Sequence, residues 1–221
     1  MINIENLSKS FQTKTDTFHA LKNINLKIKK GELIVIYGES GSGKSTLLSI
    51  IASIMKPTSG KVLVEGENIV SYSDIYASEY RKNRVGFVTQ SFHLFDELTL
   101  HDNLLAPLVI QALTKAQIEH NIDKALLIAN ISHKKSQKVN TLSGGEKQRA
   151  IIARAIINNP HIVICDEPTA NLDADNSLVF IETLKDLKAR GKTVIISTHD
   201  PIFEAQEFVD KVIFIKDGSL V

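Results

Sequence analysis

A strand, a glycine-rich loop and a helix follow one another near residue 40, and this segment constrains the fold more than any other. Leu33–Tyr37 is continuously apolar and ends at a glycine, as is typical of a strand buried on both faces of a parallel sheet. The loop GESGSGKS follows directly, and a helix is predicted from Lys44 to about Ser53. Such a loop points successive backbone N–H groups at one place beside a helix N-terminus. We therefore expect an anion site on an α/β core.

The loop matches the pattern G-x-x-x-x-G-K-[ST], in which each residue type has a chemical reason. Lys44 reaches the β- and γ-phosphates of a nucleotide, and the Ser45 hydroxyl is a ligand of Mg²⁺. The alternative is a merely flexible turn, but the position between a buried strand and a helix favours nucleotide binding. The residues expected to contact ATP here are Gly38, Glu39, Ser40, Gly41, Ser42, Gly43, Lys44, Ser45 and Thr46.

A second acidic site is predicted at the end of another buried strand, which carries the sequence IVICDE at residues 162–167. Ligands of open α/β sheets bind beyond the carboxyl ends of the strands, so Asp166 and Glu167 are expected beside the phosphate loop. Asp166 is then the carboxylate on the metal side, and Glu167 the general base that orients and deprotonates water. The alternative is two ordinary acids at the start of a loop. We interpret Cys165 as buried packing.

The rest of the chain shows three different sequence patterns. The first third and Lys61–Glu65 contain alternating strands with one polar face, among them Ile2–Leu7 and Ile24–Ile28. Residues 90–140 show helical periodicity, with a polar loop expected at 132–137. In the last third, strands alternate with helices, which predicts a mostly parallel sheet covered by helices. The expected elements there are helix Ala150–Ile157, strand His161–Cys165, helix Leu178–Arg190, strand Thr193–Ser197 and a terminal hairpin made of Val209–Ile215 and Ser219–Val221.

Composition excludes several classes of protein. The 221 residues suit one large domain, and 43% apolar residues supply a core. A formal net charge of +1 gives no reason to expect DNA, RNA or anionic lipid as the main partner. The single cysteine excludes an internal disulfide. No apolar run approaches the roughly 18–20 residues of a membrane span, so at a membrane another chain would supply the spans.

A third motif, LSGGEKQ at residues 142–148, begins the helix expected before the acidic strand. Ser143 and Glu146 have the spacing of a capping box, which could be its whole explanation. A capping box does not require Gly144 and Gly145, however. Because glycine has no side chain, these two residues leave the backbone N–H groups of the first turn uncovered, which predicts a second anion site.

This motif resembles the signature of ABC ATPases, and the resemblance covers the whole chain in the order of that family. It implies an α/β fold of the P-loop NTPase type, a RecA-like parallel sheet core with an antiparallel β subdomain and an inserted helical subdomain. The chain would be a single domain, residues 1–221. The core would comprise about 1–89 and 150–221, and the helical subdomain with the signature about 90–149.

The resemblance assigns further roles by position. Phe11 would stack on adenine, where the family more often has tyrosine, and Gln90 would sense Mg²⁺ and face the membrane partner. His199 would contact the γ-phosphate, and Asn171-Leu172-Asp173 would be the D-loop. Taken alone, these residues have ordinary explanations: Phe11 as core, Gln90 as a loop residue, Asp173 as a helix cap and His199 as a satisfied polar group.

In the family the signature contacts ATP that the opposite subunit holds, so the site would be split between two chains. The expected catalytic residues are Glu167, His199 and Gln90, and the metal side comprises Ser45, Gln90 and Asp166. The expected contacts to the partner's ATP and across the dimer interface are Ser143, Gly144, Gly145, Glu146 and Asp173. ATP and Mg²⁺ are the implied cofactors.

The function implied is that of the ATP-hydrolysing subunit of an ABC membrane complex, a homodimer when ATP is bound. It would lie peripherally on the cytoplasmic face of the inner (cell) membrane, and no nucleic-acid partner is expected. QSFHL at 90–94 and DEPTANLD at 166–173 are similar to ATPases of lipoprotein-release, macrolide-efflux and cell-division systems, which usually have glycine where Ala170 stands. Their permeases have few spans and a large extracytoplasmic domain. The alternative is a regulatory ATPase scaffold of a cell-envelope or cell-division complex without cargo translocation.

Overall fold

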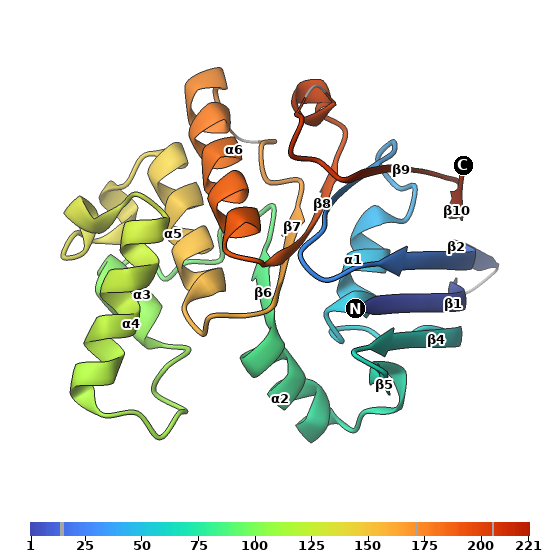
Figure 1. Ribbon diagram of the computed structural model, residues 1–221, viewed down its shortest axis with the longest axis horizontal. Coiled ribbons are helices and arrows are strands. Elements are labelled where there is room, and N and C mark those ends of the chain that lie inside the picture. Colours follow the sequence, from blue (N-terminus) through green and yellow to red (C-terminus); the bar gives the residue numbers. More distant parts are fainter. Residues whose placement is uncertain (14–15, 171, 205) are drawn as a thin grey trace.

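The computed structural model describes residues 1–13, 16–170, 172–204 and 206–221, and it contains two β-sheets flanked by helices (Figure 1). The larger sheet has six strands in the order β10-β9-β3-β8-β7-β6, all parallel except for the antiparallel hairpin between β9 and β10. Its strands are β3 (Leu33–Tyr37), β6 (Val85–Val88), β7 (Ile162–Asp166), β8 (Thr193–Thr198), β9 (Lys211–Lys216) and β10 (Ser219–Leu220).

The smaller sheet is antiparallel, with the order β2-β1-β4-β5. Its strands are β1 (Ile2–Gln12), β2 (Thr17–Ile28), β4 (Ser59–Val64) and β5 (Glu67–Asn68). It packs against the end of the larger sheet, where the Lys22 N–H donates to the Gly218 carbonyl at 2.7 Å. This contact places the antiparallel sheet beside the loop that follows β3.

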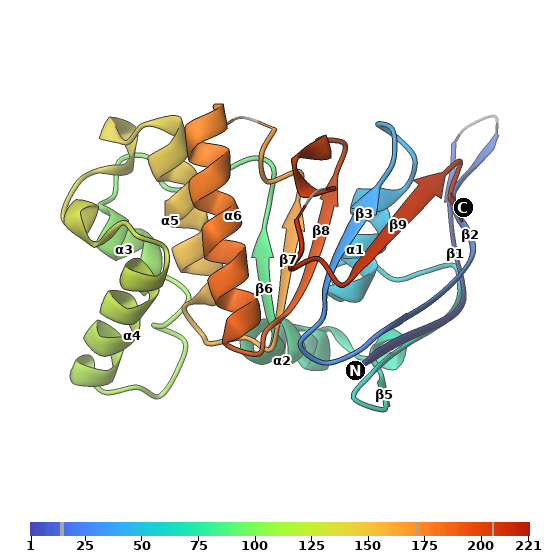
Figure 2. The same cartoon turned by 45° about the horizontal axis from the view of Figure 1, so that its top comes forward.

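Helices cover both faces of the larger sheet (Figure 2). The α-helices are α1 (Lys44–Ile51), α2 (Asp74–Arg84), α3 (Leu100–Leu105), α4 (Lys115–Ile128), α5 (Gly144–Ile156) and α6 (Ala174–Ala189). Short 3₁₀ turns occur at Ile69–Ser71, Ser132–Lys134, Val139–Thr141 and Pro201–Phe203. One apolar core packs α1 and the antiparallel sheet against one face of the larger sheet. The other core packs helices α3, α4, α5 and α6 against the opposite face.

The central strands explain why continuously apolar sequence is required. In β3, Val35 and Tyr37 belong to one core, whereas Ile34 and Ile36 belong to the other. Successive side chains of a strand point to opposite faces, so a strand covered on both sides needs apolar residues at every position. The prediction of a buried strand at Leu33–Tyr37 is confirmed.

Several predicted boundaries were wrong. The helix expected at 150–157 begins at Gly144, directly after the capping box that the sequence predicted at Ser143. The helix expected at 178–190 begins earlier, at Ala174, because Asp173 caps it. The strands expected at 2–7 and 24–28 continue into one long hairpin pair, β1 and β2. Strand β6 and helix α2 were not predicted. The polar stretch 132–137 starts with a 3₁₀ turn rather than an open loop.

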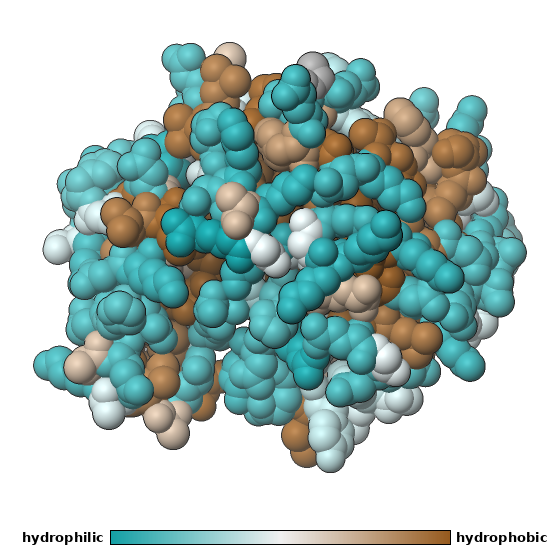
Figure 3. Space-filling view, viewed as in Figure 1, coloured by the Kyte–Doolittle hydropathy of each residue, from teal (hydrophilic) through white to brown (hydrophobic). Residues whose placement is uncertain are grey.

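Hydrophilic side chains cover most of the face seen in Figure 3. Among the residues that the structure describes, no helix has the length and apolar character needed to cross a membrane.

Candidate functional site

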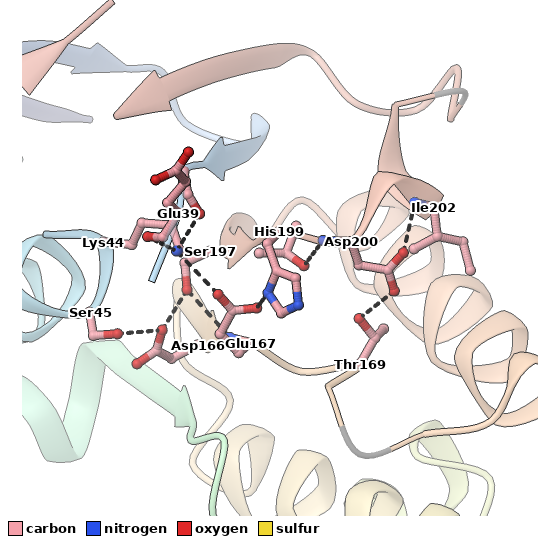
Figure 4. Close-up of polar contacts among 12 residues, drawn as sticks. Glu39, Lys44, Ser45, Asp166, Glu167, Thr169, Ser197, His199, Asp200 and Ile202 are labelled. Carbon is pink, nitrogen blue, oxygen red and sulfur yellow. Dashed lines mark hydrogen bonds and ion pairs between the residues drawn. The ribbon is translucent and has the colours of Figure 1, made fainter. Parts of the chain in front are cut away.

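The carboxyl ends of β3, β8 and β7 meet at one edge of the sheet, because β8 pairs with β3 on one side and with β7 on the other. The glycine-rich loop follows β3, the 199–200 segment follows β8, and β7 ends at Asp166 with Glu167 directly after it. Figure 4 shows that their polar side chains converge. The predicted phosphate loop and the predicted acidic site therefore form one cluster.

Two glycines of the loop are required by close contacts. A Cβ atom on Gly38 would lie 2.4 Å from the Ile215 carbonyl oxygen. Gly43 has a φ of +109°, and a Cβ there would lie 2.4 Å from the Ala20 carbonyl oxygen on β2. The loop is thus held tightly between β9 and the antiparallel sheet, and it leads directly into α1.

Lys44 and Ser42 line the inside of this loop. The Lys44 ammonium donates to the carbonyl oxygens of Gly38 at 2.7 Å and Glu39 at 3.0 Å, so it curls back over the loop. The buried Ser42 hydroxyl has no hydrogen-bond partner within the described part of the chain. A cation, an unused hydroxyl and a helix N-terminus at one concave loop fit a phosphate group.

Asp166 is held from two neighbouring segments. Its Oδ1 atom accepts hydrogen bonds from the Ser45 hydroxyl at 3.0 Å and from the Ser197 hydroxyl at 2.5 Å. Ser197 lies directly beside Asp166 in the register of β7 and β8. A hydroxyl and a carboxylate are hard oxygen ligands, so Ser45 and Asp166 together fit Mg²⁺. Sequence reasoning missed Ser197.

Glu167 lies between a cation and a histidine. One carboxylate oxygen is 3.3 Å from the Lys44 ammonium, and the other is 2.9 Å from Nδ1 of His199. Its backbone has a φ of +47°, in the left-handed region that side chains other than glycine rarely adopt. The Glu167 N–H donates to the Ser197 carbonyl at 3.0 Å, which helps to hold this conformation. The Glu167 side chain is only 13% exposed, so its carboxylate is largely shielded from solvent.

His199 is 69% exposed, and the residues on either side of it are well anchored. Asp200 accepts from the Thr169 hydroxyl at 2.9 Å and caps the 3₁₀ turn at Pro201–Phe203. The Asp200 N–H donates to the Thr198 hydroxyl at 3.0 Å. The imidazole thus stands on a fixed backbone while its ring faces solvent.

The signature segment forms the capping box that the sequence predicted. Ser143 accepts from the Glu146 N–H at 3.3 Å, and Glu146 accepts from the Ser143 N–H at 2.8 Å. The Ser143 N–H and the Lys134 ammonium, 3.1 Å away, hold the pKa of Glu146 below its usual range. Gly144 is exposed, as a bare anion site requires. Gly145 is buried, because Asn176 of α6 covers it.

The other predicted residues lie on different elements. Asp173 caps α6 through the Asn176 N–H, and Asn171 lies outside the described residues. Gln90 is exposed just beyond the carboxyl end of β6, the strand next to β7. Phe11 is 37% exposed on β1 and therefore not core, and the Lys9 ammonium lies 5.0 Å from its ring centroid.

Comparison with known proteins places this geometry in a family. The ABC transporter family profile matches residues 21–170. The ABC transporter ATP-binding protein YknY of Bacillus subtilis is 37% identical over the whole chain and 95% of its own length. The bacitracin export ATP-binding protein BceA of Halalkalibacterium halodurans is 36% identical over 97% of this chain and 85% of its own.

A dimeric structure of the ABC transporter cassette MJ0796, from Methanocaldococcus jannaschii, superposes with a TM-score of 0.91 at 37% identity. The superposition covers 100% of this chain and 96% of the MJ0796 chain. A second dimeric structure of MJ0796 represents a post-hydrolysis state bound to ADP and Pi, also at a TM-score of 0.91.

Proposed function

Because this chain belongs to the ABC transporter family and is an ATP-hydrolysing subunit with that family's P-loop fold, we propose that its ATP site is split between two copies. One copy binds Mg²⁺ and ATP on the phosphate loop, and the second closes the site with its signature turn. The observation that carries this proposal is the convergence of Lys44, Ser45, Asp166 and Glu167 at one sheet edge. ATP supplies the phosphoryl group, and Mg²⁺ neutralises its developing negative charge.

The residues of the first copy have separate tasks. Lys44 exchanges the loop carbonyls for β- and γ-phosphate oxygens, which its position over the loop supports. Ser45 and Asp166 hold Mg²⁺. Glu167 accepts a proton from water as the water oxygen attacks the γ-phosphorus and the bond to ADP breaks. His199 hydrogen-bonds Glu167, and we assign it to the γ-phosphate as well.

The second copy supplies the helix start of α5. Its Ser143 hydroxyl and the N–H groups around Gly144 and Gly145 face the γ-phosphate, with Glu146 closing the capping box and Asp173 beside them. Exposure of Ser143 and Gly144 supports this role.

Phe11 stacks on adenine from the antiparallel sheet, which its exposed ring supports. Gln90 connects the Mg²⁺ site with the membrane partner. Within the single domain of residues 1–221, residues 90–149 move as a helical subdomain against the core of 1–89 and 150–221.

We also assign a surface to the membrane partner. A groove between β6, α2 and α5 is lined by Arg81, Lys82, Val85, Gly86, Phe87, Pro107, Ile110, Arg154, Ala155 and Asn158. Among these lining residues, Ile110 is an apolar side chain that is 72% exposed. Lys82 is already paired with Glu79, so the charges of Arg81 and Arg154 together with the exposed Ile110 suit an amphipathic segment that carries a carboxylate. The partner is a permease with few spans and a large extracytoplasmic domain, and this subunit works on the cytoplasmic face of the membrane.

Substitution of Glu167 tests the proposed function. Glu167→Gln keeps the shape of the side chain but removes the proton acceptor. We expect hydrolysis to fall by about a hundredfold or more, because one positioned general base contributes about 10²–10⁴-fold. Size-exclusion chromatography with light scattering should then detect a dimer with Mg²⁺ and ATP and a monomer with ADP. Wild-type turnover by Glu167→Gln would remove Glu167 from the base role, and a variant that stays monomeric in ATP would contradict the split site.

A further inference from the structure

Asn176 lies where the first turns of α5 and α6 meet. Its Oδ1 atom accepts a hydrogen bond at 3.0 Å from Nη1 of Arg149, on α5. Its Nδ2 atom donates to both carboxylate oxygens of Asp173, at 2.9 and 3.0 Å. One amide therefore links the signature helix with the residue that caps α6.

The contact is also steric. A Cβ atom on Gly145 would lie 2.0 Å from Oδ1 of Asn176, so any larger residue there would displace the amide. Gly145 is the second glycine of the signature turn, and it is buried although Gly144 is exposed. The missing side chain at Gly145 thus serves the packing of Asn176 against the turn.

These contacts are additional to helix capping. Asp173 already accepts from the backbone N–H of residue 176 at 2.8 Å, a bond that any residue except proline would make. The side-chain bonds fix the orientation of the Asp173 carboxylate and of the Arg149 guanidinium. The Arg149 Nε atom is buried and has no partner of its own among the described residues, so Arg149 depends strongly on Asn176.

We propose that Asn176 is a positioning residue that holds the turn at 143–145 and Asp173 in one fixed relation, so that both engage the partner copy's ATP together. The inference rests on the proposed function, because both elements are assigned to the opposite subunit's nucleotide. Asn176 itself touches no reacting atom. Its loss should weaken closure of the dimer and leave nucleotide binding by a single chain intact.

The test places Asn176→Ala in the Glu167→Gln background and measures dimer dissociation in Mg²⁺ and ATP by analytical ultracentrifugation. The charge-assisted hydrogen bonds of Asn176 to Arg149 and to Asp173 are lost, so we expect the dissociation constant to rise about tenfold or more. Binding of a fluorescent ATP analogue to the monomer should be unchanged. When Asn176→Ala is made in the protein that keeps Glu167, the kcat of ATP hydrolysis should fall while the KM for ATP changes little. The matched control is Glu182→Ala, an exposed position farther along α6, which should alter none of these quantities.

A rescue series separates positioning from folding. The Thr hydroxyl both donates and accepts, so Asn176→Thr should recover most of the dimer affinity. Asn176→Asp should not, because it has no donor and adds a like charge beside Asp173. An unchanged dimer constant in Asn176→Ala, or an equal loss of monomer ATP binding and thermal stability, would overturn the inference. If the Glu167→Gln parent itself fails to dimerise, the proposed function fails first.

Discussion

Removing the Ser197 hydroxyl should cost both stability and activity. Ser197 is fully buried, and its hydroxyl donates to Asp166 at 2.5 Å and accepts from the Glu167 N–H at 3.3 Å. That N–H keeps the Ser197 carbonyl at 3.0 Å, so in Ser197→Ala only the Asp166 carboxylate loses a partner. A hydrogen bond to a charged group contributes about 1.5–3 kcal/mol. The Ser45 hydroxyl remains bound to Asp166, so we expect a loss near the lower end, about 2 kcal/mol.

Urea unfolding followed by circular dichroism measures the stability, and phosphate release measures the activity. Because the carboxylate that positions Mg²⁺ gains freedom, kcat should fall about tenfold, since small misplacements are costly in catalysis. Thr183→Val is the matched control, because its buried hydroxyl donates only to the Val179 carbonyl within α6. It should leave kcat unchanged. An unfolding free energy and a kcat for Ser197→Ala equal to those of the wild type would refute the reasoning.

Three further predictions concern the rest of the molecule. Gly86→Ala would place a Cβ 2.3 Å from the Ala155 carbonyl oxygen on α5, so urea unfolding should show a loss of about 1–3 kcal/mol; an unchanged midpoint would contradict the close packing of β6 on α5. Hydrogen bonds to Glu119 and Asp102 raise the pKa of His101 in the folded protein. The stability that protonated His101 contributes is therefore complete below the pKa of the unfolded chain and is lost as pH rises through the pKa of the folded protein. The stability difference between wild type and His101→Gln should therefore be larger at about pH 5.5 than at about pH 8.5, and a gap that grows with pH would reverse this assignment. Burial raises the pKa of the Cys165 thiol and shields it from solvent. A disulfide reagent should therefore label the native protein at least about a hundredfold more slowly than the urea-unfolded chain. Comparable labelling rates would show that Cys165 is accessible in the folded protein.

The parts of the fold that the sequence predicted are those with strong local signals. The strand at Leu33–Tyr37 is apolar at every position because cores lie on both faces, and glycine marks its end. The capping box at Ser143 and the terminal hairpin after β9 likewise depend on residues close together in the chain. Local rules suffice where the determining contacts are local.

The missed elements lack such signals. Strand β6 has only four residues and includes Gly86, which a strand rarely favours but which the close approach of α5 requires. Helix α2 buries only Ala77 and Tyr80, so its apolar periodicity is faint. Tertiary contacts decide both elements.

The same distinction applies to the site. The roles expected of Lys44, Asp166 and Glu167 follow from motifs at the ends of buried strands, and the structure brings these side chains together. Ser197 could not be chosen from sequence, because its contact with Asp166 depends on β8 lying next to β7. Asn176 is likewise visible only once α5 and α6 meet. Their one sequence signal is a polar residue close to a motif, which is too common to select.

Complementation between two inactive variants tests the split site most directly. Lys44→Ala removes the phosphate-loop cation, and Ser143→Arg obstructs the signature turn, so each variant alone should be nearly inactive. In an equal mixture half of the dimers are mixed, and each mixed dimer has one intact composite site. Hydrolysis should therefore recover to roughly a quarter of the wild-type rate per chain. A mixture as inactive as its components, or Ser143→Arg alone hydrolysing at the wild-type rate, would contradict a site built from two copies.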